Sequence, residues 1–360
     1  MTIALFIAVL FFLILVHELG HFLTAKWSRM RVDEFAIGFP PRLFSIKKGE
    51  TEYSINLLPI GGYVKIFGEN GTDESDGARA FGSRPRYQQA IVLLAGVTMN
   101  ILAAWLIFLA VAMIGTPTAV GEDGYDPELA NLTVVAVTPM SPAAEAGIPT
   151  GSKIVSVTAE NGSLNELTPT AFTSFVGEAE GEINVHYTHK GELGSATLIP
   201  RAGVVTEEPD REVVGLSTAL VEIRSLPPME ALKTATIRTW ELLYAITVGI
   251  ISFIGSAFTL SADIEAVTGP IGIAGMVGDA AEFGFTSLLT FTAFISLNLA
   301  VINLLPIPAL DGGRLLFVLA EAVIRRPIDP EWMGRVNFIG FALLILLMVA
   351  VTYNDILRLF

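Results

Sequence analysis

A short run of ionisable residues lies inside an otherwise apolar segment of the chain. His17, Glu18 and His21 form the pattern H-E-x-x-H within residues 1–25. On a helix, positions i and i+4 lie on one face, so both imidazoles can bind one Zn²⁺ while Glu18 lies beside the metal to take a proton from water. Each ionisable group in a membrane span costs about 2.5 kcal/mol or more, so three together indicate a functional site. The alternative is a hydrogen-bonded polar cluster that packs helices together.

A third ligand is needed, because catalytic zinc sites usually have three protein ligands and one open position. We expect it to be Asp311, the only acid between Glu282 and Glu321. Asp311 ends an apolar run that is interrupted by Pro306 and Pro308. Backbone groups freed in a membrane are tolerated only within protein or beside a wet cavity. Taken alone, Asp311 fits equally well an aspartate that ends a helix at the water interface.

The composition assigns these residues to a membrane protein. Of 360 residues, 52% are apolar and 16% are charged, and the mean hydropathy is +0.60; a soluble domain has about 25% charged residues. Four stretches have the roughly 20 residues that cross a hydrocarbon core: 1–25, 90–114, 287–310 and 336–354. The lack of cysteine excludes disulfides and thiolate sites. The net charge of −14 argues against nucleic acid as a partner.

Charge differs between the loops and predicts the orientation of the chain. Residues 26–89 contain ten of the 22 Lys and Arg residues, whereas residues 115–235 contain six basic and 17 acidic residues. Basic loops stay on the cytoplasmic side of a membrane. We therefore expect residues 26–89 in the cytoplasm and residues 115–235 outside.

A fifth apolar stretch, residues 242–262, is weaker. If it crossed the membrane, Asp311 would end about 30 Å from the two histidines, which zinc–ligand bonds of about 2 Å cannot bridge. We therefore expect this stretch to lie along the external interface, or to enter and leave on the same side.

Between the second and third spans the pattern changes to short strands and turns. We expect strands at 132–137, 153–157, 183–186 and 196–199, and short helices at 141–146 and 169–176. Within residues 137–157, the elements Ser141-Pro-Ala, Ala146-Gly147 and Gly151-Ser152-Lys-Ile resemble a PDZ domain, which usually has Asp in place of Ser152. The resemblance implies an extended peptide bound at a sheet edge. The alternative is a β-rich external domain without a ligand.

Two motifs together are highly specific. His17-Glu18-x-x-His21 and Asn303-x-x-Pro306-x-Pro308-x-Leu310-Asp311-Gly312 resemble the site-2 protease family of intramembrane zinc metalloproteases. The similarity is to the bacterial PDZ-containing branch, of the regulator of sigma-E type, and extends to residues 38–44, 61–65 and 269–273. The best-known members carry two PDZ-like domains, whereas residues 115–235 have room for one. The resemblance implies cleavage of single-pass membrane proteins within or near their transmembrane segment, usually after another protease has removed the external part.

The resemblance also implies how substrate is held. Asn303, Pro306 and Pro308 would contact it, and residues 35–66 would form a β-hairpin that dips into the membrane. The alternation of residues 51–57, and of 62–66 after a turn at 59–61, supports a hairpin. Its edge at Gly62, Tyr63 and Val64 could bind an unwound substrate by backbone pairing. The alternative is an ordinary cytoplasmic hairpin.

The sequence therefore predicts an α-helical polytopic membrane protein of about four transmembrane helices, with a membrane-associated β-hairpin and an inserted β-rich PDZ-like domain. The expected parts are a first membrane core segment (1–114), an external PDZ-like domain (115–225), an interfacial or re-entrant helical segment (226–286) and a second core segment (287–360). The expected location is the inner (plasma) membrane, with the PDZ-like domain on the external or periplasmic side.

The expected activity is zinc-dependent peptide hydrolysis with Glu18 as general base. The expected partners are single-pass membrane substrates, membrane lipids and a peptide or protein ligand at the PDZ-like domain, with no nucleic acid. The rival functions are a membrane-anchored PDZ adaptor with a non-catalytic metal site and a zinc transporter. The presence of Glu18, which zinc binding does not require, argues against the adaptor.

Overall fold

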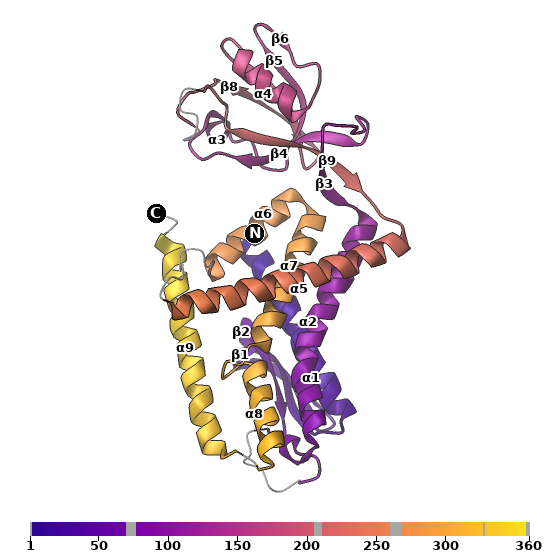
Figure 1. Ribbon diagram of the computed structural model, residues 1–360, viewed down its shortest axis with the longest axis vertical. Helices are drawn as coiled ribbons and strands as arrows, with labels where there is room; N and C mark the ends of the chain where they lie inside the picture. The colour runs from indigo at the N-terminus through magenta and orange to yellow at the C-terminus, as the bar shows by residue number, and fades with distance from the viewer. Residues whose placement is uncertain (1, 70–76, 205–210, 260–267, 327, 358–360) are drawn as a thin grey trace. The chain divides into compact units, whose positions relative to one another are not determined.

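A computed structural model describes residues 2–69, 77–204, 211–259, 268–326 and 328–357 of the chain. Two compact units are found (Figure 1). Unit 1 comprises Met1–Ala110, Ala231–Asp279 and Leu289–Phe360, and unit 2 comprises Val111–Glu230 and Ala280–Leu288.

Unit 1 is built mainly from long helices. They are α1 (Thr2–Trp27), α2 (Arg86–Ile114), α5 (Pro228–Phe258), α6 (Pro270–Phe283), α7 (Phe285–Leu304), α8 (Asp311–Ile324) and α9 (Pro330–Leu357), with a short 3₁₀ turn, η1, at Phe81–Ser83. Among the described residues, α1, α2, α5, α7 and α9 are long and apolar enough to cross a membrane. The four predicted spans lie in α1, α2, α7 and α9, and most of the weaker fifth stretch lies in α5.

Helix α5 differs from the other candidate spans in direction. It runs roughly horizontally in Figure 1, whereas α2, α8 and α9 run roughly vertically. Apolar side chains of α5 pack with those of α2 and α7 in one buried cluster, and Trp105 Nε1 of α2 donates to Thr236 Oγ1 of α5 at 3.1 Å. This direction agrees with the predicted course of residues 242–262 along the interface, which stays a prediction. Residues 260–262 lie outside the described residues.

The third predicted span ends earlier than the apolar pattern indicated. Helix α7 stops at Leu304 instead of continuing to 310, because Pro306 and Pro308 supply no backbone N–H and disfavour helix before them. The chain turns back through Ala309, whose φ is +77°, and α8 starts at Asp311. A side chain on Gly312 would overlap carbonyl oxygens of the connection, so the glycine lets α8 pack directly against this turn.

The predicted β-hairpin is present but is longer and more bent than expected. Strands β1 (Val32–Lys48) and β2 (Thr51–Ile66) pair along their length, so the predicted turn at 59–61 is wrong. Strand β1 bends near Gly38, whose φ is +84°, opposite residues 58–62 of β2, and pairing therefore continues through the bend. The bent hairpin folds back on itself: Phe35 faces both Val64 and Tyr53. In the described register, residues 62–65 pair only with 34–37, which leaves their other side as an edge.

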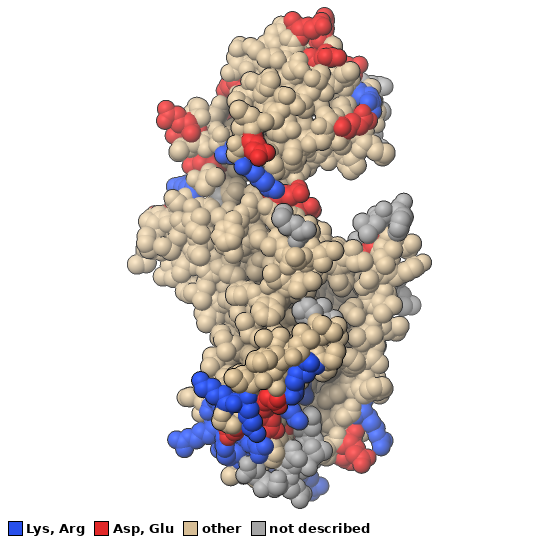
Figure 2. All heavy atoms as spheres, turned by 180° about the vertical axis from the view of Figure 1, so that it is seen from behind, with Lys and Arg blue, Asp and Glu red and all other residues tan. Residues whose placement is uncertain are grey.

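The surface of the hairpin combines apolar and basic side chains. Large apolar side chains near the bend are exposed, among them Phe39, Leu43, Phe44, Leu57 and Leu58. Lys and Arg gather at the end of unit 1 that contains the hairpin (Figure 2). This combination suits a segment that meets both lipid and the polar boundary of a membrane.

Ion pairs and a buried carboxylate fix the ends of these elements. At the hairpin turn, Glu50 accepts hydrogen bonds from Arg79 and Lys26, each at 2.7 Å, and these lower the pKa of Glu50 to about 2. At the other end of unit 1, the buried carboxylate of Asp355 in α9 accepts the backbone N–H groups of Gly269 and Gly272 at 2.9 and 3.0 Å. It thereby satisfies donors at the start of α6.

Unit 2 contains one antiparallel sheet with two short helices. Its elements are β3 (Thr116–Val120), β4 (Ala130–Val137), α3 (Pro142–Glu145), β5 (Lys153–Ala159), β6 (Gly162–Ser163), α4 (Pro169–Glu178), β7 (Ile183–His189), β8 (Glu192–Leu198) and β9 (Leu216–Arg224). The strand order is β3-β9-β4-β5-β7-β8, with β6 on β5. The four predicted strands and both helices are confirmed, whereas β3, β6 and β9 were not predicted. Ser141 and Thr168 cap α3 and α4 through backbone N–H groups, each at 3.2 Å.

Candidate metal centre

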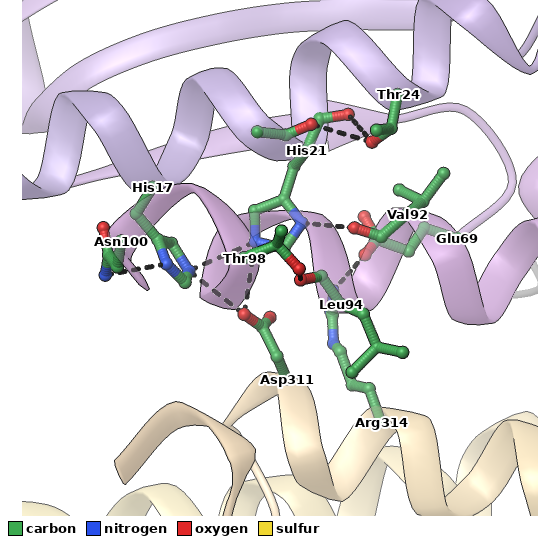
Figure 3. Close-up of polar contacts among 11 residues, drawn as sticks. His17, His21, Thr24, Glu69, Val92, Leu94, Thr98, Asn100, Asp311 and Arg314 are labelled. Carbon is green, nitrogen blue, oxygen red and sulfur yellow. Dashed lines mark hydrogen bonds and ion pairs between the residues drawn. The ribbon is translucent and has the colours of Figure 1, made fainter. Parts of the chain in front are cut away.

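Three of the predicted site residues converge between α1 and the first turn of α8 (Figure 3). Asp311 Oδ2 lies 3.0 Å from His17 Nε2 and 3.2 Å from His21 Nε2. The two Nε2 atoms are 3.1 Å apart, so the three atoms form a nearly equilateral triangle. Both histidines are buried and the Asp311 side chain is 19% exposed. Helical spacing brings the histidines together, and the turn after α7 brings Asp311 to them.

The triangle fits a tetrahedral zinc ion. Bonds of about 2.0–2.1 Å at tetrahedral angles separate neighbouring ligand atoms by about 3.3 Å, close to the three distances here. Asp311 Oδ2 is buried and makes no hydrogen bond of ordinary geometry within the described residues, although two imidazole nitrogens lie beside it. If the lone pairs of both Nε2 atoms and of Asp311 Oδ2 all point at one metal position, neither imidazole nitrogen offers Oδ2 a hydrogen. Two histidines and a carboxylate are a donor set that catalytic zinc sites use.

Helix α2 supports both imidazoles from behind. His21 Nδ1 donates to the Val92 carbonyl oxygen at 2.8 Å, and the Asn100 amide lies 3.3 Å from His17 Nδ1. Between them is Gly96, where a Cβ would overlap the His21 ring and lie 2.6 Å from His17 Cε1. These residues were not predicted. A glycine and an asparagine four positions apart in an apolar span are the signal that could have indicated them.

The edge of the hairpin passes beside the general-base candidate. A Cβ on Gly62 would lie 3.2 Å from Glu18 Cγ and 3.1 Å from Ile14 Cγ2, so the backbone of Gly62 runs against α1 at this level. Tyr63 stacks on Phe39 with ring centroids 6.4 Å apart, and Val64 packs on a buried cluster. Of the three predicted edge residues, the structure thus brings Gly62 to Glu18.

The remaining predicted substrate residues lie on the segment that leads to Asp311. Asn303 is half-buried in the last turn of α7, and Pro306 is exposed. Pro308 packs tightly against Gly340 of α9, since a Cβ there would lie 2.5 Å from Pro308 Cβ. The chain N–H after Pro308 donates to Asn337 Oδ1 at 3.3 Å. Helix α9 therefore holds this connection in place.

A charged contact adjoins the centre on α8. One turn after Asp311, Arg314 pairs with Glu69, which lies just beyond β2 (Figure 3). A second pair, Arg86 with the buried Glu321, joins α2 to α8 at 2.7 Å. Both pairs line a cavity of about 380 Å³. The edge strand and the helix that carries Asp311 are thus tied to one another.

Comparison with known proteins extends over almost the whole chain. The family model for peptidase family M50 matches residues 5–347. A candidate zinc metalloprotease of Clostridium perfringens is 37% identical over 96% of this chain and 95% of its own length. The zinc metalloprotease RasP of Geobacillus kaustophilus is 31% identical, over 99% of this chain and 97% of its own. The regulator of sigma-W protease RasP of Bacillus subtilis is 30% identical, over 100% and 99%.

Proposed function

The chain belongs to peptidase family M50, the site-2 protease family of zinc metalloproteases, and we propose that His17, His21 and Asp311 bind its catalytic Zn²⁺. The triangle of two imidazole nitrogens and one carboxylate oxygen, with sides of 3.0 to 3.2 Å, carries this proposal. Three protein ligands leave one position open for water or a substrate carbonyl.

Glu18 acts as the general base. It follows His17 directly on α1 and lies beside the edge strand at Gly62. The metal, when bound, supplies a Lewis acid that makes water nucleophilic near neutral pH and polarises a carbonyl. Glu18 takes a proton from the attacking water and returns it to the leaving amine. Glu18 is not a ligand, which distinguishes this site from a storage or transport site.

The edge of the hairpin holds the substrate backbone. A transmembrane helix satisfies its own backbone hydrogen bonds, and it must be unwound before a peptide bond can be attacked. In the described register, residues 62–65 have one side without a paired strand and Gly62 lies beside Glu18, so an extended segment can add there as a further strand. Asn303 and the turn at Pro306 and Pro308 bound the site on the Asp311 side.

These features indicate a protease for single-pass membrane proteins. Five candidate spans and a metal centre on α1 and α8 accord with a reaction in the membrane, and the basic residues near the hairpin support a cytoplasmic location for that end. The proposed location of the protein is the inner (plasma) membrane of a bacterial cell, with unit 2 on the external side. Substrates trimmed by another protease are the expected class.

The PDZ-like unit provides a groove for peptide. A cavity of about 190 Å³ lies between Phe172 and Val176 of α4 and the segment from Val213 to Ser217. In the described register, the first residues of β9 pair with β4 on one side only, because β3 begins its pairing at Leu220. An extended peptide can add there, which would let unit 2 select substrates without taking part in the chemistry.

The test separates metal binding from catalysis. The full-length protein and its Glu18→Gln variant are placed in liposomes with a trimmed, tagged single-pass substrate. Glu18→Gln is expected to keep one zinc per chain and lose cleavage, whereas His21→Ala loses both. Glu241→Gln, at an exposed position on α5, is the matched control and should behave like the unmodified protein.

Three results would contradict the proposal. Cleavage by Glu18→Gln would remove Glu18 from the general-base role, and loss of its zinc would make Glu18 part of the metal site. Binding of zinc by the unmodified protein without any cleavage of the trimmed substrate would favour the adaptor.

A further inference from the structure

Asn100 makes a contact with the metal centre that the proposed mechanism does not use. Its side chain is fully buried in α2, and its amide group lies 3.3 Å from His17 Nδ1. The opposite atom of the same amide, Oδ1, is buried and has no hydrogen-bond partner among the described residues. A buried polar group with one contact has its orientation decided by that contact.

The role of this contact follows from which nitrogen of His17 binds the metal. Either end of the Asn100 amide can face His17 Nδ1, since Nδ2 and Oδ1 are alike in shape. When Nε2 binds a metal ion, the imidazole hydrogen is on Nδ1, which then needs an acceptor. Oδ1 of Asn100 has no other partner among the described residues, so it is the atom that can accept this hydrogen.

The second histidine shows what Asn100 has to supply. His21 Nδ1 already donates to a fixed acceptor, the Val92 carbonyl oxygen, at 2.8 Å. That acceptor is backbone and cannot change, so His21 is held ready for the metal. His17 has a side-chain amide at the equivalent place, which can serve as donor or acceptor. The two ligands therefore differ in what holds them, although both are supported by α2.

We propose that Asn100 is a positioning residue for the zinc site: its side-chain oxygen accepts a hydrogen bond from His17 Nδ1 and so fixes the imidazole with Nε2 directed at the metal. The proposal rests on the proposed function, because it takes His17 as a ligand. Outer partners of metal-bound histidines typically change metal affinity by about 10–100-fold. The backbone of Asn100 is anchored to α7, since Ser296 Oγ donates to the Asn100 carbonyl oxygen at 2.8 Å.

The experiment measures zinc affinity of the full-length protein in detergent by competition with a chelator, together with the visible spectrum of the Co²⁺-loaded protein. Asn100→Leu removes the acceptor and should weaken zinc binding by about 10–100-fold. Asn100→Asp keeps the shape and offers a fixed acceptor, so it should bind zinc at least as tightly as the unmodified protein, with a Co²⁺ spectrum of unchanged band shape. Thr98→Val on the same helix, whose hydroxyl only bonds the Leu94 carbonyl, is the control and should change neither measurement.

The outcomes separate this proposal from the assignment of the metal centre. If His17→Ala keeps full zinc affinity, His17 is not a ligand and the centre itself is wrongly assigned. If His17→Ala loses zinc but Asn100→Leu does not, the centre stands and the role of Asn100 is refuted. Equal losses in Asn100→Asp and Asn100→Leu would also refute it, because a packing role alone would not distinguish an acceptor from a methyl group.

Discussion

Replacing Gly96 by alanine should favour the helical conformation of α2 but disturb the metal centre. Alanine is favoured over glycine in a helix interior by about 1 kcal/mol, so α2 itself should be at least as stable in the variant. The added Cβ, however, would lie 2.6 Å from His17 Cε1 and 2.8 Å from His17 Nε2, and would overlap the His21 ring. Ordinary van der Waals contact begins at 3.4 Å, so the His17 ring is about 0.8 Å too close.

Metal sites do not tolerate displacements of this size. Zinc–ligand distances vary by about 0.2 Å, which is roughly a quarter of the movement that the new methyl group requires. Because the two histidines are one turn apart on α1 and both rings face Gly96, neither ring can move away without changing the distances among the three ligand atoms. We expect Gly96→Ala to weaken zinc binding by at least about 100-fold, the upper end of the effect of outer-sphere changes, and to lose cleavage with it.

The assay is zinc content and chelator competition on purified full-length protein, with helix content followed by circular dichroism. Gly249→Ala is the matched control, since it lies in α5 with open space around its Cα and should bind zinc normally. If Gly96→Ala binds zinc as tightly as the unmodified protein, the packing argument is refuted, and so is the role of α2 as the helix that supports both imidazoles.

Three further changes test other parts of the structure. The folded pKa of Glu50 is about 2, below its ordinary value of 4.5, so its contribution to stability is complete well above pH 4.5 and is lost progressively as pH falls from 4.5 through about 2. Hydrogen-exchange protection factors at the hairpin turn, which correct for the intrinsic pH dependence of exchange, should therefore be equal at pH 6 and pH 7 and fall as the pH approaches 2. Asp355→Leu leaves two N–H groups at the start of α6 without acceptors and should destabilise the protein by about 1–3 kcal/mol, seen as a lower melting temperature in detergent, whereas an unchanged value would show that the carboxylate does not hold α6. Single cysteines at Lys233 and at Glu265, which lies outside the described residues, should both react with an impermeant reagent from outside, and reaction from opposite sides would make α5 a crossing helix.

The parts of the site that depend on local spacing could be predicted from the sequence. His17 and His21 are four residues apart on one helix, and three ionisable groups in an apolar span indicate function by their cost alone. Asp311 could be proposed because it is isolated in an apolar region next to two prolines. The four predicted spans, which lie in α1, α2, α7 and α9, could likewise be predicted, because hydropathy is read from consecutive residues.

The parts that depend on contacts between distant segments could not be predicted. Asn100 and Gly96 meet the histidines across more than seventy residues of chain, so their spacing in an apolar span could mark them as unusual but could not show that they face His17 and His21. The bend of the hairpin likewise depends on pairing between β1 and β2 at the same level, whereas alternation alone suggested two strands separated by a turn. Strand β9 was not predicted, because the residues before it show no pattern of a turn followed by a strand. Its place between β3 and β4 depends on the pairing of the whole sheet.

The order of the ligands along the chain has a consequence for how the protein is made. The two histidines are synthesised among the first residues, whereas Asp311 leaves the ribosome only after α2, the whole of unit 2 and α7. A nascent chain that ends at Pro308 thus contains two of the three proposed metal ligands and is expected to bind zinc weakly and cleave nothing. If the proposed ligands are correct, the protein is expected to stay inactive while its first helices are inserted, and it can bind its metal tightly only once Asp311 has been synthesised.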